Sequence, residues 1–501
     1  DITPALWGRC CVVRLTKVSV FVNNYLLSLQ VVVGRPSMNR IPMGVMFVTI
    51  AIIMAVISIN WFINVEDKRP TIEGPNIVLI VSDDQRYDTL QSMPFLADLM
   101  SKGTTFTRGY VTTPLCCPSR SSILSGQYAH NHGVLSNTAP DGGFDQFNDS
   151  ATLPVWLQDA GYQTGLFGKY LNGYSNEDVA YKPPGWDVFH AFVNEPGYFV
   201  FRLTRHRTDK YEGNTSYLNA DKVYSTDLLA LEAAAFIKEA AAEPEHPFFV
   251  MYTPYAPHGP VTPPTRYENE TTGEENLPSY NEADVSDKSS WFETRPLLTE
   301  AEETRIQVTK DKTSGTLRGL DDGIQTIVQA LNEAGVAENT VIIYIADNGF
   351  HWGEHRIPFG KSTPYEESVH VPLYLYDGRD QIGQTDNRLA LNIDLAPTIA
   401  ALAGIATPNN LDGRSLLDPQ FERQHFLSEN WQGQLSPFTA VHTGQMILIS
   451  FKNGEQELYD LETDPYQLKN IINDPAYATQ KTKLEAELEL LRACQGDDCQ
   501  Q

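Results

Sequence analysis

Residues 75–86 read PNIVLIVSDDQR, an unbroken aliphatic run that ends in two adjacent carboxylates. A short apolar run bounded by polar and turn residues is typical of a strand buried on both faces. The same design recurs at residues 340–348, TVIIYIADN, which end in an aspartate and an asparagine. Because strands of this kind occur in sheets covered by helices on both faces, the two runs predict a large α/β domain.

The polar residues that follow the two runs predict a metal site. They are Asp83, Asp84, Asp347 and Asn348. Ligands bind beyond the carboxyl ends of strands in an open α/β sheet, so both pairs are expected to meet in one crevice. Either pair alone fits a strand-end turn or a helix N-cap equally well. Two pairs at two strand ends favour a hard divalent cation, Ca²⁺ or Mg²⁺, held by oxygen ligands.

Composition limits the class of protein and of partner. The chain has 501 residues, of which 42% are hydrophobic and 20% charged, and a formal net charge of −26. This length and apolar content are enough for one large core plus an appendage, and they exclude a mainly disordered chain. The negative field repels polyanions, so we expect no nucleic-acid partner, and a small anionic substrate needs a local basic pocket.

Residues 41–65, IPMGVMFVTIAIIMAVISINWFINV, carry no charge and follow Arg40. A bilayer core takes roughly 20 apolar residues, so the segment predicts a signal anchor or an uncleaved signal, with the rest of the chain exported and held at the membrane. The alternative is a buried core helix, which the length and uniform apolarity of the run disfavour. Because an exported protein normally begins shortly before such a segment, Met38 is the expected start and residues 1–37 form a doubtful leader.

The cysteines raise a chemical question. They are Cys10, Cys11, Cys116, Cys117, Cys494 and Cys499. In an exported protein Cys494 and Cys499 can close a small disulfide loop. Neighbouring Cys116 and Cys117 would be strained as a disulfide with each other, and no second cysteine pair lies at zinc-finger spacing. The remaining interpretation of this pair is a nucleophile.

Basic side chains that suit an anion occur at similar places along the chain. They are Arg120, Lys169, His258 and Lys361. Each of these, taken singly, is typical of a solvated surface group or a loop histidine. Lys169 and His258 follow the strand-like runs TGLF and PFFVMY, however, so both are expected on the rim that carries the carboxylates.

Residues 116–126, CCPSRSSILSG, resemble the sulfatase signature Cys-x-Pro-Ser-Arg, and from about Asn76 onward the other motifs follow in the sulfatase order. The words GQYAHNHGV and GKYLNGY, at residues 126–134 and 168–174, are similar to the glucosamine-6-sulfatase and heparan endosulfatase branch. The resemblance implies the mixed sheet of the alkaline-phosphatase superfamily, with helices on both faces and a smaller C-terminal α/β subdomain.

The resemblance also explains the adjacent cysteines. It implies that a maturation enzyme oxidises Cys116 to Cα-formylglycine, while Cys117 fills the variable position of the signature as a small packing residue. A hydrated aldehyde carries two hydroxyls on one carbon: one attacks sulfur, and the second re-forms the carbonyl and expels sulfate. A serine hydroxyl at the same place would leave a stable sulfate ester.

Further roles follow from matching position in the family. The implied ligands of one Ca²⁺ are Asp83, Asp84, Cys116 in its modified form, Asp347 and Asn348, with a sulfate oxygen. Asp347 is also placed to take the proton of the attacking hydroxyl. Arg120 is expected to hold the hydrate, Lys169 and Lys361 to grip the sulfate oxygens, and His258 or Lys361 to protonate the leaving alcohol.

One position departs from the family pattern. Many sulfatases have a histidine two residues after the lysine of GKYLNG, where this chain has Leu171. Asn172 and His132 are the candidates to replace it. We also expect His132, Asn172, His351 and His355 to contact the substrate.

The remaining chain is organised around this centre. We expect a leader over 1–37, an anchor and linker over 38–74, a catalytic domain over 75–417 and a C-terminal subdomain over 418–501. Polar residues 267–303 predict a long surface excursion. Asp321 and Asp322 are interpreted as the cap and first turn of an amphipathic helix. Near the C-terminus Asn453-Gly454 predicts a hairpin turn, and a later helix has one apolar face. That face consists of Leu484, Leu488 and Leu491.

The predicted activity is hydrolysis of a sulfate ester, on a sulfated carbohydrate such as 6-O-sulfated N-acetylglucosamine or on an aryl sulfate. A broad arylsulfatase is one alternative. A phosphodiesterase or phosphatase of the same superfamily is another, although it would normally carry Thr or Ser at position 116 and ligands for two zinc ions. A binding protein that keeps the fold without the activity is the third.

Overall fold

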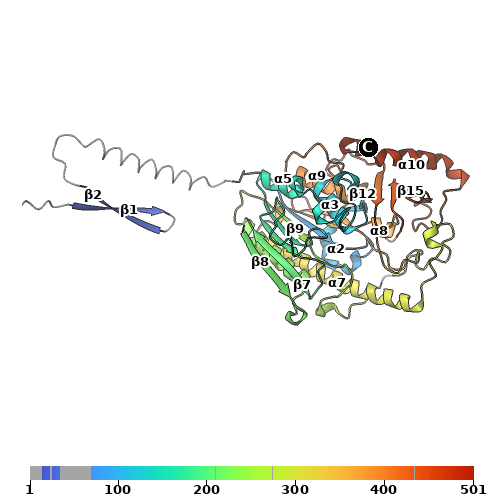
Figure 1. Ribbon diagram of the computed structural model, residues 1–501, viewed down its shortest axis with the longest axis horizontal. Helices are drawn as coiled ribbons and strands as arrows, with labels where there is room; N and C mark the ends of the chain where they lie inside the picture. Colours follow the sequence, from blue (N-terminus) through green and yellow to red (C-terminus); the bar gives the residue numbers. More distant parts are fainter. Residues whose placement is uncertain are drawn as a thin grey trace, which may run out of the picture. The chain divides into compact units, whose positions relative to one another are not determined.

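The computed structural model describes residues 14–22, 25–33, 69–208, 210–273, 275–433 and 435–500. It divides into two units, residues 1–68 and 69–501 (Figure 1). In the first unit β1 (Arg14–Val22) and β2 (Tyr25–Val33) form an antiparallel hairpin. The predicted membrane segment, residues 41–65, lies outside the described residues. Among the helices that are described, none is long and apolar enough to cross a bilayer.

A ten-stranded mixed sheet forms the centre of the second unit, in the order β12-β4-β11-β10-β3-β9-β5-β6-β7-β8. The strands are β3 (Asn76–Ser82), β4 (Thr104–Tyr110), β5 (Gln163–Gly168), β6 (Val188–Phe192), β7 (Phe201–Arg207), β8 (Lys210–Tyr217), β9 (Phe248–Thr253), β10 (Thr340–Ala346), β11 (Leu373–Asp377) and β12 (Gln384–Leu391). From β10 through β6 all neighbours are parallel, while β11, β7 and β8 run antiparallel to theirs.

The two apolar runs predicted as buried strands are β3 and β10, and they are direct neighbours. They pair in parallel, with Asn76 opposite Thr340 and Ser82 opposite Ala346. Every residue of both strands is buried. Both runs therefore end at the same edge of the sheet, which confirms the prediction that the polar pairs after them share one crevice.

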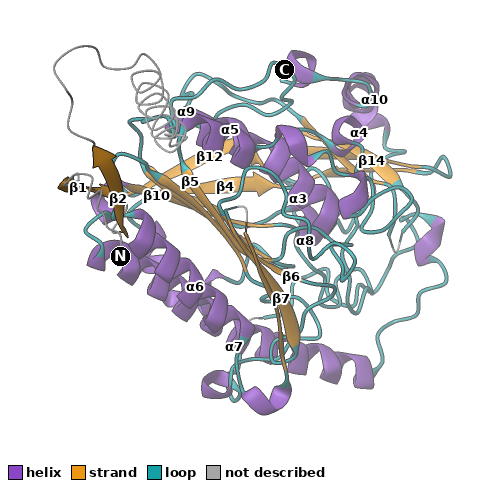
Figure 2. Ribbon diagram, turned by 60° about the vertical axis from the view of Figure 1, so that its left-hand side comes forward, coloured by secondary structure: helices purple, strands orange, loops and turns teal. Residues whose placement is uncertain are grey.

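Helices cover both faces of the sheet, as predicted (Figure 2). The covering helices are α2 (Pro94–Met100), α3 (Cys116–Ser125), α5 (Leu153–Ala160), α6 (Ser225–Ala240), α7 (Glu300–Glu333) and α9 (Leu395–Leu402), and the chain also forms the short helices α4 (Ala129–His132) and α8 (Glu366–Val369) and the C-terminal helix α10 (Ala478–Leu491). Alternate side chains of β3 enter different layers: Ile77 packs with α3, α5 and α9, whereas Val78 packs with α2, α6 and α7. This alternation follows from the two-residue period of a strand.

The C-terminal part adds an antiparallel sheet of β13 (Phe426–Asn430), β14 (Phe438–His442), β15 (Met446–Phe451) and β16 (Gln456–Asp460). The hairpin between β15 and β16 turns at Asn453-Gly454, where Gly454 takes a φ of 90°, so the predicted turn is confirmed. The predicted apolar face of α10 packs against this sheet through Leu484, Leu488 and Leu491. Cys494 and Cys499 form the disulfide that the sequence suggested.

The prediction that Asp321 and Asp322 begin a helix is wrong. Helix α7 begins at Glu300, after a capping box in which Thr299 and Glu302 satisfy each other's backbone N–H groups. Asp321 lies in the middle of α7 and caps a different helix. Its carboxylate accepts hydrogen bonds from the backbone N–H groups of Phe95 (2.9 Å) and Leu96 (2.8 Å) in the first turn of α2.

The glycines around Asp321 explain the misleading pattern. A Cβ at Gly319 would lie 2.9 Å from Pro264, and one at Gly323 would lie 2.7 Å from the hydroxyl of Tyr252. These glycines allow neighbouring segments to approach α7 closely. They do not mark a helix end.

Replacing Asp321 by Ala should destabilise the protein by about 1–3 kcal/mol, because two N–H groups at the start of α2 lose their acceptor. The neighbouring variant Asp322→Ala removes a carboxylate near the surface that pairs with exposed Arg266 and accepts from the Tyr267 hydroxyl, and it should cost no more than about 1 kcal/mol. Urea unfolding of both variants measures the difference. An equal loss of unfolding free energy in the two variants would contradict the capping role of Asp321.

Candidate active site

The carboxyl ends of β3 and β10 bring the predicted acidic residues together. Because the strands pair in register, Asp347 N donates a hydrogen bond to Ser82 O (3.0 Å), and Asp84 N donates to Asp347 Oδ1 (3.1 Å). Asp83, Asp347 and Asn348 have no exposed surface. Asp84 adopts a φ of 64°, and non-glycine residues in this region cluster at functional sites.

Cys116 is the first residue of α3 and lies beside these carboxylates. Its Sγ is 3.6 Å from Asp83 Oδ1, 3.9 Å from Asp84 Oδ1 and 2.7 Å from Lys361 Nζ. One ligand atom each from Asp83, Asp84, Cys116 and His258 lie within 4.8 Å of one another. The signature cysteine and the metal-ligand candidates thus form a single cluster.

Buried cations match the buried carboxylates. Arg120 Nε donates to Asp347 Oδ2 (2.8 Å), Lys169 Nζ donates to Asp83 Oδ2 (2.6 Å), and Lys361 Nζ donates to Asp84 Oδ1. Each carboxylate therefore has a cationic partner, as buried charges require. Burial by itself raises the pKa of Asp83, but Lys169, His258 and Arg120 outweigh burial and lower that pKa to about 2. Asp83 therefore stays ionised throughout the physiological range.

His258 lies in the loop after β9, at the more exposed side of the cluster. Its side chain is 22% exposed, against 5% for Asp84, and its Nε2 is 3.6 Å from Asp84 Oδ2. Its Nδ1 lies 2.6 Å from Gly259 O. Since a carbonyl oxygen only accepts, Nδ1 carries a proton and Nε2 is the nitrogen that faces the cluster.

The two cysteines have different surroundings. Burial raises the pKa of the Cys116 thiol more than Lys169 and Lys361 lower it, so the unmodified side chain is a neutral thiol and a weak nucleophile. Cys117 belongs to the apolar core with Leu171, and burial raises its pKa to about 12. Of the two, only Cys116 contacts the charged cluster.

The donor set fits a hard cation. Asn348 Nδ2 donates to Asp84 Oδ1 (2.8 Å) and to Gly349 O (2.9 Å), whereas Asn348 Oδ1 is buried without a hydrogen-bond partner. A buried acceptor without a partner costs about 1–3 kcal/mol unless a cation or a donor faces it. Oxygen atoms from three carboxylates and this amide are the ligands that Ca²⁺ prefers.

The structure brings together most of the predicted site residues. They are Asp83, Asp84, Cys116, Arg120, Lys169, His258, Asp347, Asn348 and Lys361. Their individual chemical roles remain predictions. Asn172 lines a cavity of about 210 Å³ together with Lys169, and its Oδ1 is buried without a partner. Leu171, at the position of the missing histidine, is 4% exposed and belongs to the core.

Three histidines predicted to contact substrate do not face an open site. His132 uses both ring nitrogens, accepting from Val134 N (3.1 Å) and bonding Ser122 Oγ (3.1 Å). His351 is fully buried against Thr363 Oγ1 (2.7 Å), and burial lowers its pKa to about 3. His355 is also fully buried. Burial of His351 and His355 and the two hydrogen bonds of His132 lend no support to substrate contact, which stays a prediction for these three residues.

His355 belongs to a buried charged network beneath the loop that follows β10. Its Nδ1 is 2.7 Å from Glu282 Oε2 and its Nε2 is 3.6 Å from Glu367 Oε2. In the same loop Glu354 accepts from Arg86 Nη1 (3.0 Å) and from Trp352 N (2.6 Å). Ion pairs thus fix the segment that leads from Asn348 to Lys361.

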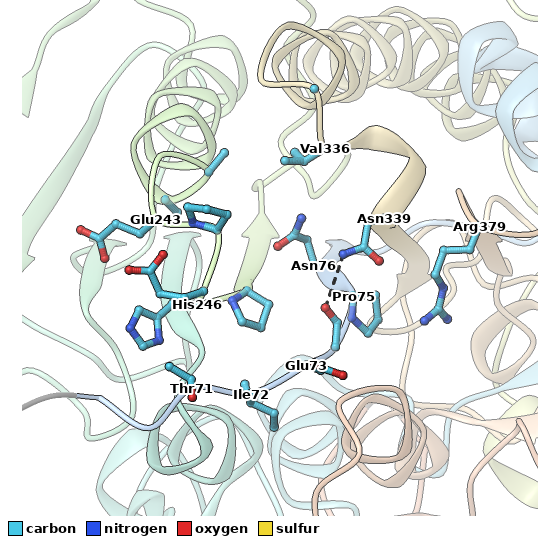
Figure 3. Close-up of a pocket in the computed structure, with 17 residues that line it drawn as sticks. Thr71, Ile72, Glu73, Pro75, Asn76, Glu243, His246, Val336, Asn339 and Arg379 are labelled. Atoms are coloured by element: carbon cyan, nitrogen blue, oxygen red, sulfur yellow. Dashed lines mark hydrogen bonds between the residues drawn. The ribbon is translucent and has the colours of Figure 1, made fainter.

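Two cavities differ in their relation to the cluster. One of about 350 Å³ includes Asp84, Pro257 and Gly259 and is closed by one face of α7. Another, of about 750 Å³, includes Asn76 and Val336 (Figure 3). Asn76 begins β3, about 20 Å along the strand from Asp83, so this second cavity lies at the opposite edge of the sheet from the charged cluster.

The face of α7 in the smaller cavity was missed in the sequence, because the helix was expected to begin near Asp321. Arg305 and Lys312 lie on it. Their seven-residue spacing on one side of a helix is the signal that could have identified them.

Comparisons with known proteins agree with this geometry. The family described as Sulfatase matches residues 75–405, and the family described as N-sulphoglucosamine sulphohydrolase, C-terminal, matches residues 353–494. An arylsulfatase of Volvox carteri is 33% identical over 85% of this chain and 76% of its own length. An N-acetylglucosamine-6-sulfatase of Capra hircus is 30% identical over 85% of this chain and 84% of its own.

A putative extracellular sulfatase Sulf-1 homolog of Caenorhabditis elegans is 34% identical over 68% of this chain, and the match spans 48% of that protein. Among solved structures, a protein in complex with its substrate D-glucosamine-2-N,6-O-disulfate superposes with a TM-score of 0.70 at 23% identity, covering 83% of this chain and 97% of the other. A phosphonate monoester hydrolase of Agrobacterium radiobacter gives 0.65 at 21% identity, covering 84% and 95%. These two similarities concern the fold.

The His355 network predicts a pH-dependent stability. Burial and Lys288 lower the pKa of His355, but Glu367 and the hydrogen bond to Glu282 raise it above 6.5 overall. A raised folded-state pKa contributes stability that is complete below the unfolded pKa and is lost as pH rises through the folded pKa. His355→Gln should therefore cost about 3–5 kcal/mol below pH 6.5, since Glu282 and Glu367 lose the buried cation between them and Glu282 keeps only Lys288, 3.6 Å away. Urea unfolding measures the difference in unfolding free energy between the variant and the unaltered chain, and this difference should become smaller at alkaline pH. A difference that becomes larger there would contradict this account.

Proposed function

This chain belongs to the sulfatase family, and we propose that it hydrolyses the sulfate ester of a sulfated amino sugar, with 6-O-sulfated N-acetylglucosamine as the preferred unit. The observation that carries the proposal is the position of Cys116, the first residue of the signature, within hydrogen-bond reach of Asp83 and Lys361 in a buried charged cluster. The alternative within the family is an arylsulfatase of broad specificity.

The nucleophile follows from the surroundings of Cys116. A buried neutral thiol beside three carboxylates is a poor nucleophile, which supports its conversion to Cα-formylglycine by a maturation enzyme. The hydrate of that aldehyde supplies two hydroxyls on one carbon, one to attack sulfur and one to expel sulfate when the carbonyl re-forms. Cys117 contributes packing only.

The cation is proposed to be one Ca²⁺, held by the oxygen atoms of Asp83, Asp84, Asp347 and Asn348 together with residue 116. When bound, it would orient the ester and offset the charge of the transferring group. The unpartnered Oδ1 of Asn348 supports this assignment.

The remaining steps, which are proton transfer and binding of the sulfate oxygens, are assigned to individual side chains of the cluster. Arg120 fixes Asp347 through Oδ2, while Oδ1 accepts from Asp84 N and keeps a second lone pair for the proton of the attacking hydroxyl. Lys169 and Lys361 each place an ammonium beside the cluster, where both can contact sulfate oxygens. His258 is the most exposed of these groups, and its Nδ1 is already held by Gly259 O. Its Nε2 is therefore better placed than Lys361 to protonate the leaving alcohol.

Export is supported by the relatives named extracellular sulfatases, and the disulfide between Cys494 and Cys499 fits an oxidising compartment. Anchoring through residues 41–65 stays a prediction. A phosphatase of the same superfamily and an inactive binding protein are disfavoured by the cysteine at position 116 with its full set of charged partners.

The proposed substrate is tested with a panel of glucosamine 6-sulfate, N-sulfoglucosamine, galactose sulfates and nitrophenyl sulfate, using protein made with its maturation system. The 6-sulfate should give the highest kcat/KM. Turnover of nitrophenyl sulfate with none of the sugars would overturn the sugar assignment while leaving sulfatase activity intact.

Substitution separates the two cysteines. Cys116→Ala should abolish turnover, and Cys116→Ser should become sulfated once and stall, because one hydroxyl gives no route for elimination. Cys117→Ala is the matched control and should keep activity within about threefold, since it deletes one small core side chain. In the active protein, mass spectrometry of the peptide with residue 116 should show one oxygen in place of a sulfur and two hydrogens. Full activity with Cys116 unmodified would contradict the mechanism.

Loss of a metal ligand should separate activity from folding. Asp84→Asn should remove bound calcium, measured by elemental analysis, and lower kcat/KM about 100-fold or more. The circular dichroism spectrum should be retained, because the cores on both faces of the sheet are untouched. Asp98→Asn, which changes an exposed side chain of α2, is the control and should change neither calcium content nor rate. An active variant without calcium would refute the metal assignment.

A further inference from the structure

The cavity of about 350 Å³ that includes Asp84 has a wall built by a single face of α7. That wall consists of Arg305, Val308, Thr309, Lys312 and Thr313. Their spacing of three and four residues places them in one row along the helix. Phe350, Trp352 and Phe359 line the cavity as well.

The two cations on this wall differ from those in the cluster. Both Arg305 and Lys312 are exposed, and neither forms a salt bridge among the residues that the structure describes. The Arg305 guanidinium lies 4.6 Å from the centre of the Phe359 ring, a contact that holds it against the cavity wall. In contrast, Arg120, Lys169 and Lys361 are all paired with carboxylates.

The positive charges of Arg305 and Lys312 contrast with the negative charge of the protein as a whole. The whole chain carries a formal charge of −26, so its field opposes the approach of an anionic substrate. Arg305 and Lys312 line the same cavity as Asp84 and oppose that field locally. They are seven residues apart, about 10 Å along the helix axis, and Val308 between them is 46% exposed. The wall thus presents a cation, an apolar surface and a second cation.

The cavity also lies on the side of the leaving group. Pro257 and Gly259 line it, and the Nε2 of His258 between them points toward Asp84 Oδ2. An alcohol that leaves by accepting a proton from His258 would occupy this cavity with the rest of its sugar.

We propose that this cavity is a second anion-binding subsite, in which Arg305 and Lys312 hold anionic substituents of the sugar other than the ester being cleaved. The inference rests on the proposed sulfatase activity and extends it: the substrate is a polyanionic sugar, carrying a further sulfate or a carboxylate, and a singly charged sugar is a poorer one. Arg305 and Lys312 determine specificity and take no part in bond cleavage.

The kinetic test compares glucosamine 6-sulfate carrying an N-sulfate with the same sugar carrying an N-acetyl group. The variants are Arg305→Gln, Lys312→Gln and the double variant. The ratio of kcat/KM for the doubly charged sugar to that for the singly charged one should fall about tenfold in the double variant, because ion-assisted hydrogen bonds are lost. Added salt should lower the same ratio in the unaltered chain more than in the double variant.

The control double variant is Lys102→Gln with Lys483→Gln, which removes the same charge from two exposed sites, one just after α2 and one on α10. It should leave the ratio unchanged. A disaccharide with a uronate carboxylate in place of the N-sulfate identifies the anion that the subsite binds. If the Arg305/Lys312 double variant also lowers the relative kcat/KM for this disaccharide, the subsite accepts a carboxylate. If it does not, the subsite requires the sulfate. If the Arg305/Lys312 double variant lowers kcat/KM equally for the doubly and singly charged sugars, or for neither, the proposed subsite is wrong.

Binding separates the subsite from the proposed activity. Calorimetry of the doubly sulfated sugar with the full chain carrying Cys116→Ala needs no turnover. Adding Arg305→Gln and Lys312→Gln should weaken that binding about tenfold. If the unaltered chain hydrolyses neither sugar but the two substitutions still weaken binding, the proposed activity is wrong and the proposed subsite is supported. Unchanged binding would refute the subsite whatever the activity.

Discussion

The in-register parallel pairing of β3 with β10 is the constraint on which the site depends. Ser82 lies opposite Ala346, so the carboxylates that follow are forced side by side with almost no exposed surface. Like charges in that position are tolerated only with cations in contact. Arg120 from α3, Lys169 after β5 and Lys361 from the loop after β10 supply them. Much of the fold can be understood as the means by which distant segments deliver these cations to one edge of the sheet.

Burial of the cluster also separates chemistry from recognition. Residue 116 and its partners are buried, whereas His258 and the α7 face border more open space. In the proposed mechanism, bond cleavage takes place in a low-dielectric pocket where charges act strongly, and the rest of the substrate is selected outside it. The ion pairs of Arg86 with Glu354 and of His355 with Glu282 fix the loop between these regions.

The sequence predicted what local pattern determines. The runs that became β3 and β10, the carboxylates at their ends and the signature at Cys116 could be read because each is carried by a few consecutive residues. The surroundings of His132, His351 and His355 could not, because partners distant along the chain, such as Glu282 for His355, decide whether a histidine faces substrate. The helix start predicted at Asp321 was wrong for a related reason. The glycines beside it allow close packing, but in the sequence alone they resemble a helix boundary.

The central claim is that the cluster around Cys116 hydrolyses sulfate esters with a bound cation. It is tested most directly by measuring kcat/KM for a sulfate monoester and the phosphate monoester of the same alcohol, each with and without a calcium chelator. The account predicts that the sulfate ester is clearly preferred and that chelation abolishes its turnover. Preference for the phosphate ester, or sulfate turnover that survives complete removal of the metal, would contradict it.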